Sequence, residues 1–199
     1  MFAILFGYVF ASQTWLFIGD SLTEGYGLSK ESAFPAKLEK LWNEKHPDDT
    51  IQVFNAGVSG ATSAIGPQTL RFYLKKDVDV VFVALGANDG LRGQPIKALE
   101  KNLENVISLS KEKQLSLVLL GMRIPTNYGQ EYTKEFTQLY SKLAKKHDLL
   151  LYPFLLEGVA ANKDLNLKDG IHPNEKGYSL IAEKLYKFIR KNYDKIKSH

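Results

Sequence analysis

The chain has 199 residues, 44% of them hydrophobic and 24% charged, which fits one globular domain and excludes a largely disordered, collagen-like or coiled-coil chain. It contains no cysteine, so disulfides, iron–sulfur clusters and cysteine-ligated zinc sites are excluded. Its formal net charge of +4 is too small to indicate nucleic-acid binding.

The first eleven residues, MFAILFGYVFA, are apolar, and the first charge in the chain is Asp20. This stretch resembles the apolar region of a secretory signal, and Val9 and Ala11 are small enough for its cleavage site, but a basic segment before it is missing. We expect residues 1–11 to be a signal peptide or an apolar N-terminal extension packed on the protein. Residues 12–199 are expected to form a single domain. No apolar run reaches the roughly 18–20 residues that a membrane-spanning helix requires.

Short apolar runs alternate with longer amphipathic segments along the rest of the chain. The apolar runs predict five strands, over residues 15–18, 51–54, 78–85, 115–120 and 149–154. Apolar residues three and four apart predict helices over residues 33–46, 66–74, 95–113, 132–147 and 174–193. This alternation is typical of an α/β protein, a three-layer α/β/α sandwich around a parallel sheet. The expected strand order is flavodoxin-like, 2-1-3-4-5.

Ligands of an open parallel sheet bind outside the carboxyl ends of its strands, so histidines near those ends are candidate catalytic bases. His46 and His147 lie at the ends of predicted helices, where they are expected at the surface or as caps, and His199 is terminal. His172 alone follows the fifth strand in a loop bounded by glycine and proline, three residues after Asp169. Asp169 and His172 are therefore either an acid–base pair or a loop hydrogen-bonding motif.

A nucleophile and an oxyanion site are also available at these ends. Ser21 follows the first strand in a turn that can expose its hydroxyl as a nucleophile, although a helix N-cap serine fits the same position. The backbone N–H groups of Ser21 and Gly57 and the side-chain amide of Asn88 are candidate oxyanion donors. Taken singly, Gly57 and Asn88 also fit a turn glycine and a turn asparagine. Asp20 and Asp89 are expected to hold turns in shape.

Four segments together resemble the GDSL/SGNH hydrolase family, in the family's order and over about residues 14–195: Gly19-Asp20-Ser21-Leu22, Asn55-Ala56-Gly57, Gly86-Ala87-Asn88-Asp89 and Asp169-Gly170-Ile171-His172. The resemblance is to the bacterial thioesterase I, arylesterase and lysophospholipase subgroup. It implies the SGNH hydrolase fold and a serine esterase that hydrolyses fatty acyl esters and thioesters. The implied catalytic residues are Ser21, Asp169 and His172, and the implied oxyanion residues are Ser21, Gly57 and Asn88. It also implies a small-molecule substrate, no metal or other cofactor, and a periplasmic or secreted location.

An acyl chain needs an apolar groove beside the serine. The candidates follow the fourth and fifth strands: Ile124, Pro125, Tyr128, Leu156 and Ile171, with Leu155 and Val159 beside them. Each of these residues could instead pack a loop. The basic C-terminal helix predicts either a solvated face or a weak contact with an anionic membrane surface. We expect a monomer.

Two other functions remain open on this sequence. A carbohydrate O-deacetylase would use the same four segments, but the apolar residues after the fourth and fifth strands disfavour a sugar site. A non-catalytic flavodoxin-like module would bind a phosphate at Ser21, Thr23 and Gly25. That second alternative leaves Asp169, His172, Asn88 and Gly57 without a role.

Overall fold

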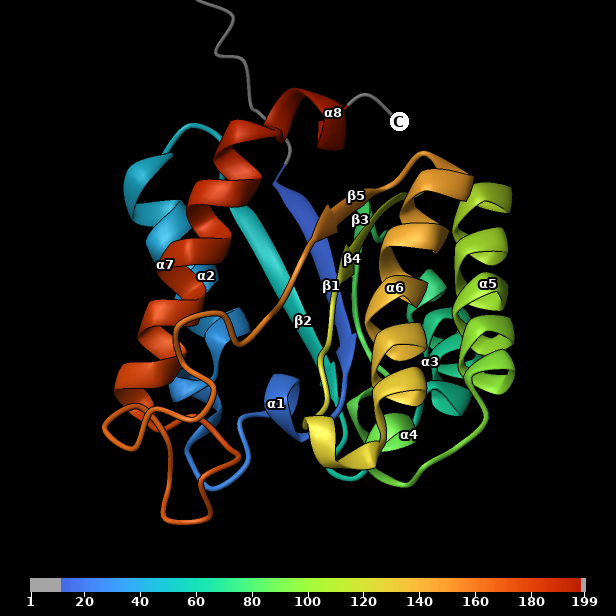
Figure 1. The fold of residues 1–199 in the computed structure, drawn as a ribbon. Coiled ribbons are helices and arrows are strands. Elements are labelled where there is room, and N and C mark those ends of the chain that lie inside the picture. Colours follow the sequence, from blue (N-terminus) through green and yellow to red (C-terminus); the bar gives the residue numbers. More distant parts are fainter. Residues whose placement is uncertain (1–11, 198–199) are drawn as a thin grey trace, which may run out of the picture.

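A computed structural model describes residues 12–197 and contains one five-stranded parallel sheet (Figure 1). Its strand order is β2-β1-β3-β4-β5, which confirms the predicted flavodoxin-like order. The strands are β1 (Gln13–Gly19), β2 (Ile51–Gly57), β3 (Val80–Ala84), β4 (Ser116–Leu120) and β5 (Leu150–Tyr152). The expectation of a signal peptide at residues 1–11 lies outside the described residues.

Helices cover both faces of the sheet, as predicted for a three-layer sandwich. The helices are α1 (Ser21–Glu24), α2 (Phe34–Lys45), α3 (Gly66–Tyr73), α4 (Ala87–Leu91), α5 (Ile96–Glu112), α6 (Gln130–His147), α7 (Glu175–Lys191) and α8 (Tyr193–Lys197). Figure 1 shows α2 and α7 on one face and α3, α5 and α6 on the other. No helix within residues 12–197 is long and apolar enough to cross a membrane.

The strand side chains form the centre of the core. Residues 15–18 of β1 are fully buried, and every residue of β3 and β4 is buried, because helices cover both faces of these strands. The rings of Phe17 and Phe82 stack across β1 and β3 with centroids 4.4 Å apart. This packing fixes where β1 and β3 end, and the first site residues follow those ends directly.

Two of the short helices were not predicted, and both lie at the carboxyl edge of the sheet. The helices α1 and α4 follow β1 and β3 after one and two residues, and they carry Ser21 and Asn88. Four- and five-residue helices leave too short an apolar pattern to be read from a sequence. In Figure 1 both helices lie at the lower end of the molecule, where the strands end.

Candidate active site

Ser21 is the first residue of α1, and Asp20 is the N-cap of that helix. Asp20 Oδ1 accepts a hydrogen bond from Leu22 N–H at 3.0 Å, so the interpretation of Ser21 as an N-cap serine is wrong. The carbonyl of Ser21 accepts from the N–H groups of Gly25 and Tyr26, both at 3.1 Å. Ser21 N–H has no partner among the described residues. The turn therefore fixes the Ser21 backbone and leaves its N–H and hydroxyl available.

The structure brings Ser21, His172 and Asp169 together from segments about 150 residues apart in the chain. His172 Nε2 lies 2.9 Å from Ser21 Oγ, and His172 Nδ1 lies 2.7 Å from Asp169 Oδ2. A carboxylate only accepts hydrogen bonds, so Nδ1 carries the proton and Nε2 faces the hydroxyl as an acceptor. This arrangement can remove the proton of Ser21 and hold it on His172.

Asp169 is fixed by its own loop as well as by His172. Its Oδ1 accepts from the backbone N–H groups of Ile171 and His172, at 2.9 and 3.0 Å. Partial burial by itself would raise the pKa of Asp169, but these two N–H groups and the His172 side chain outweigh it and lower the pKa to about 2. Asp169 therefore stays ionised at neutral pH, as a partner of a histidine base requires.

Asp20 and Asp89 hold the polar network beside Ser21. Asp89 accepts from the backbone N–H and the hydroxyl of Ser63, at 2.8 and 2.6 Å. Asp20 Oδ2 accepts from Asn88 Nδ2 at 3.5 Å, which orients that amide toward the turn. Burial raises the pKa of Asp20 to about 6, against the lowering effect of the Leu22 N–H. Both aspartates shape turns, as predicted, and Asp20 links the Ser21 turn to Asn88.

The expected role of Gly57 as an oxyanion donor needs a correction. Its N–H already donates to Asn55 Oδ1 at 3.0 Å, so it is not free for a substrate. A Cβ at Gly57 would lie 2.2 Å from Glu24 N, which shows that this glycine allows β2 to pass close to α1. Position 57 therefore requires glycine because of packing. The local sequence does not distinguish such a glycine from one that is required for ligand binding.

Gly60, three residues later, is a functional candidate that the sequence analysis missed. It is exposed, its φ is +75°, and its N–H has no partner among the described residues. Ser59 Oγ donates to Glu24 at the end of α1, and Arg92 after α4 donates to Gly60 O at 2.9 Å. The loop therefore lies between the helix that carries Ser21 and the helix that carries Asn88. A second glycine in the same loop was the available signal.

The five candidate groove residues have different positions. Tyr128 is 37% exposed and its hydroxyl donates to Leu91 O at 2.9 Å, and Ile171 is 55% exposed. Pro125 is exposed and Leu156 is half-buried. Ile124 is buried in the core, where it packs against Gly90. Its neighbours in the prediction, Leu155 and Val159, are also core residues. An apolar residue after a strand can turn inward, and only the path of the loop decides that.

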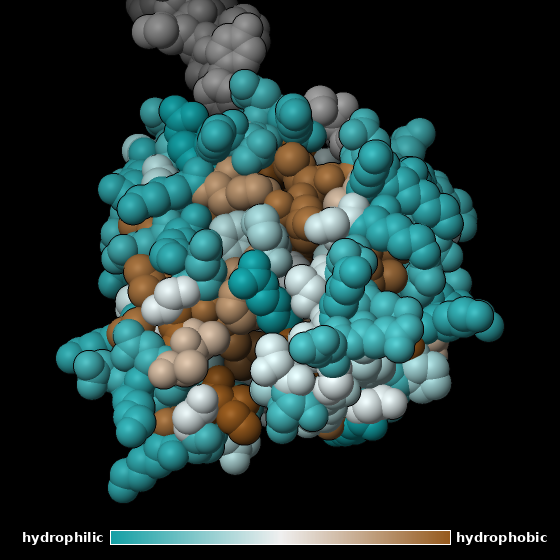
Figure 2. All heavy atoms as spheres, in the orientation of Figure 1, coloured by the Kyte–Doolittle hydropathy of each residue, from teal (hydrophilic) through white to brown (hydrophobic). Residues whose placement is uncertain are grey.

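Exposed large apolar side chains gather at the carboxyl edge of the sheet. Within the described chain, those of this kind are Tyr26, Val58, Phe72, Leu91, Tyr128 and Ile171. All except Phe72 follow the carboxyl end of a strand or the short helix after it. Figure 2 shows apolar surface among hydrophilic residues toward this lower end of the molecule. Tyr26, Val58 and Leu91 were missed because a single exposed apolar residue carries no signal in a sequence.

Two further expectations concern groups that a ligand could contact. Thr23 is fully buried and Gly25 ends α1 with its N–H bonded to Ser21 O, so the phosphate site of the alternative binding module, at Ser21, Thr23 and Gly25, does not form. Within residues 12–197 no cluster of three or more histidine, aspartate and glutamate side chains could hold a metal ion. His46 caps α2 and His147 ends α6, as predicted.

Comparisons with known proteins identify the family of this chain. The model of the GDSL-like lipase/acylhydrolase family matches residues 17–180. An arylesterase from Vibrio mimicus is 38% identical over 174 residues, covering 87% of this chain and 86% of the relative. Thioesterase 1/protease 1/lysophospholipase L1 from Escherichia coli K12 is 38% identical over 181 residues, covering 90% and 85%.

A solved structure gives the same result for the fold. The crystal structure of the psychrotrophic esterase EstA from a Pseudoalteromonas species superposes with a TM-score of 0.86 at 32% identity. The match covers 92% of this chain and 100% of that one. These findings confirm the resemblance that the four sequence segments indicated. The chain therefore belongs to the GDSL-like lipase/acylhydrolase family, and it is a hydrolase with the fold of that family's esterases.

Proposed function

We propose that this chain hydrolyses carboxylic esters and thioesters of fatty acyl groups through an acyl-enzyme on Ser21. The observation that carries the proposal is the position of His172, 2.9 Å from Ser21 Oγ and 2.7 Å from the carboxylate of Asp169. The relatives named arylesterase and thioesterase 1/lysophospholipase L1 support both the ester and the thioester substrate class.

The reaction has two steps. His172 Nε2 takes the proton of Ser21 Oγ as this oxygen attacks the acyl carbonyl, and Asp169 stabilises the imidazolium. The carbonyl re-forms, the bond to the leaving oxygen or sulfur breaks, and His172 returns the proton to the departing alcohol or thiol. A water molecule then gives a proton to His172 and attacks the acyl carbon. The free acid leaves, and Ser21 Oγ regains its proton.

The tetrahedral oxyanion needs donors that are not already bonded. We assign Ser21 N–H, the second N–H of Asn88 Nδ2 and, in place of Gly57, the N–H of Gly60. Neither backbone N–H has a partner among the described residues, and Asp20 fixes the Asn88 amide. Each donor of this kind is worth roughly 10²–10³ in turnover.

The acyl chain is bound by apolar side chains that remain exposed around this edge. Val58, Leu91, Tyr128 and Ile171 are 37–55% exposed and belong to the segments that follow four different strands. The hydrogen bond from Tyr128 to Leu91 O joins the segments after β4 and β3 into one wall. Burial of such surface by a methylene chain contributes about 0.8 kcal/mol per CH₂, so medium and long chains should bind better than acetate.

The experiment is hydrolysis of p-nitrophenyl esters from acetate to palmitate by the wild type, Ser21→Ala and His172→Ala. We expect turnover to peak above acetate and to fall by at least ~10³-fold in both variants. His46→Ala is the matched control, because His46 caps α2 and contacts Tyr186 instead of the site. Near-normal rates in folded Ser21→Ala would overturn the acyl-enzyme. Turnover on acetate alone would indicate a deacetylase.

We also propose that residues 1–11 direct export to the periplasm or the exterior. Their apolar character and the small residues Val9 and Ala11 support this. N-terminal sequencing of protein secreted by a bacterial host should find Ser12 as the first residue. Retention of Met1 in the cytoplasmic fraction would contradict export.

The last part of the proposal is that the protein acts as a monomer and contacts anionic membranes only weakly. The basic residues of α7 and α8 support that contact, although Lys184 Nζ is already bonded to Glu157 O. Sedimentation velocity should give one species near the chain mass of 22.4 kDa. Co-sedimentation with anionic vesicles should be weak and lost in high salt.

A further inference from the structure

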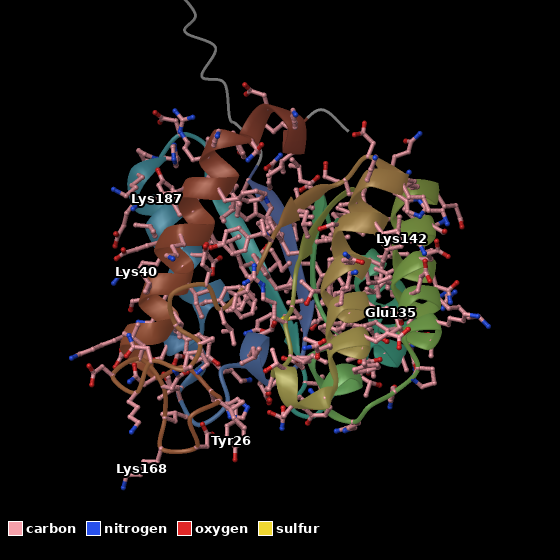
Figure 3. All side chains as sticks on the ribbon, viewed as in Figure 1. Tyr26, Lys40, Glu135, Lys142, Lys168 and Lys187 are labelled. Carbon is pink, nitrogen blue, oxygen red and sulfur yellow. The ribbon has the colours of Figure 1, made fainter. Side chains whose placement is uncertain are left out.

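Tyr26 contacts two members of the candidate triad, His172 through its ring and Ser21 through its backbone. Its hydroxyl has no hydrogen-bond partner within residues 12–197. Its ring centroid lies 4.5 Å from that of the His172 imidazole, with the planes at 38°. Its backbone N–H donates to Ser21 O at 3.1 Å. The side chain is still 50% exposed. Figure 3 shows Tyr26 at the lower end of the molecule, beside the loop that carries Lys168.

The glycines that flank Tyr26 fix its position. Gly25 and Gly27 have φ values of +94° and +79°, which only glycine adopts without strain. A Cβ at Gly27 would lie 2.7 Å from Leu167 Cδ1, so this segment touches the His172 loop at a second point. Leu167 N–H in turn donates to His172 O at 2.7 Å. Residues 25–27 therefore join the Ser21 turn to the His172 loop.

Besides Tyr26, the groups around His172 either bond to its two ring nitrogens or lie farther away. Ser21 Oγ and the Asp169 carboxylate occupy the two ring nitrogens, and the buried Asp20 carboxylate contributes charge from the turn. Tyr178 of α7 places its hydroxyl 3.5 Å from Ser21 O. Within residues 12–197, Tyr26 is the one aromatic ring that contacts the imidazole. The Tyr26 ring thus covers one face of the His172 imidazole, whereas the hydrogen bonds to the two nitrogens lie in the plane of the ring.

We propose that Tyr26 is a positioning residue, which holds the His172 ring against Ser21 and keeps water from one face of the imidazole. This inference rests on the proposed function of Ser21 and His172. The contact uses the ring and not the hydroxyl, so phenylalanine should replace tyrosine. An aromatic contact of this kind corresponds to a factor of about 2–10 in rate.

The test compares Tyr26→Ala and Tyr26→Phe with the exposed aromatic control Phe72→Ala, on p-nitrophenyl acetate and octanoate. We expect Tyr26→Ala to lower kcat about 2- to 10-fold on both esters with little change in KM. Tyr26→Phe and Phe72→Ala should keep the wild-type kcat. The rate at which diethyl p-nitrophenyl phosphate phosphorylates the serine should fall by the same factor, because this probe has no acyl chain.

Two results for Tyr26→Ala would overturn the inference. A higher KM for octanoate alone in Tyr26→Ala would make Tyr26 an acyl-chain contact, and an unchanged kcat would leave it without a role. If Tyr26→Ala does not fold, Gly27→Ala provides the second variant, since its Cβ pushes Leu167 and the His172 loop away. It should lower kcat on both esters, and an unchanged kcat contradicts the proposal. An active Ser21→Ala variant would instead reject the proposed function itself.

Discussion

The candidate nucleophile Ser21 and the candidate base His172 are held in place in opposite ways. The Ser21 turn lies in the core: Asp20 and Thr23 are 1% and 0% exposed, and Gly19 and Gly57 have no room for a Cβ. The His172 loop lies at the surface, where the Asp169 side chain is 36% exposed. Packing against strands that are distant in the sequence positions the Ser21 turn. The His172 loop is positioned largely by hydrogen bonds within its own segment.

The hydrogen bonds of the loop show how it does so. Leu167 N–H donates to His172 O, and Asn174 N–H donates to Leu165 O at 2.9 Å. Asn174 Nδ2 reaches Asp164 O at 2.9 Å, while its Oδ1 caps α7. These bonds stay within the segment from residue 162 to the start of α7. Changes in the turn should therefore affect stability and activity together, whereas changes in the loop should affect activity with little unfolding.

The largest effect is expected from Asp169→Asn in the loop. The amide cannot accept both backbone N–H groups and stabilise the imidazolium, so kcat should fall about 10³- to 10⁴-fold. The melting temperature at pH 7 should change little, because the side chain is partly exposed. Ester hydrolysis and thermal melting of the same samples check both statements. A large loss of melting temperature would break the distinction between the loop and the turn.

Gly57→Ala in the turn should lower the free energy of unfolding by about 3 kcal/mol. Its Cβ would meet backbone atoms of Thr23 and Glu24, which cannot move as a side chain would. Gly170→Ala is the matched loop variant, with φ +71° and nothing within 4 Å of the new Cβ. It should lose only about 1 kcal/mol. Urea unfolding measures both, and equal losses would contradict the comparison.

Asp20→Asn tests the buried turn by pH. The folded-state pKa of Asp20 is raised to about 6 from 3.8, so wild-type stability falls as pH rises between these values. The asparagine variant lacks this loss and should gain roughly 2–3 kcal/mol relative to wild type between pH 4 and 7. Urea unfolding at pH 4, 5.5 and 7 measures it. If the difference in unfolding free energy between variant and wild type did not depend on pH, burial would not raise the pKa of Asp20.

Asp169→Asn should show the opposite dependence in the same experiment. The folded-state pKa of Asp169 is lowered to about 2, so its contribution is present above about pH 4 and is lost as pH falls toward 2. Because the side chain is partly exposed, solvent screens this contribution, so the variant should be only slightly less stable than wild type at pH 7, and this small difference should shrink in acid. Stability differences that change with pH in opposite directions in the Asp20 and Asp169 variants would support the contrast between a buried turn and an exposed loop.

The smallest effect is expected from Asn174→Asp. The aspartate still accepts from Lys176 and Gly177 N–H and so keeps the N-cap of α7, but it no longer donates to Asp164 O. Stability should change by less than about 1 kcal/mol, and kcat should fall about threefold as the loop loosens. Steady-state kinetics at 15 and 35 °C check this, and an unchanged kcat at both temperatures would remove Asn174 from the support of His172.

The layout of the fold and most of the candidate site can be predicted from the amino-acid sequence alone. Continuous apolar runs located β1, β3 and β4 to within a few residues, since strands buried on both faces leave that local pattern. The parallel order then placed Ser21 and Asn88 at one edge, with Asp169 and His172 in the loop after β5. These positions follow from short-range sequence pattern and from the topology of a parallel sheet.

Which polar groups at that edge remain free of hydrogen bonds follows only from the packing of the folded chain. Gly57 N–H is lost to Asn55 while Gly60 N–H stays open, Asp20 caps α1 in place of Ser21, and Ile124 turns into the core. The contact of Tyr26 with His172 joins residues that are far apart in the chain. Each outcome depends on competition for hydrogen bonds and space between distant segments. Such competition is settled by packing and leaves no local pattern in the sequence.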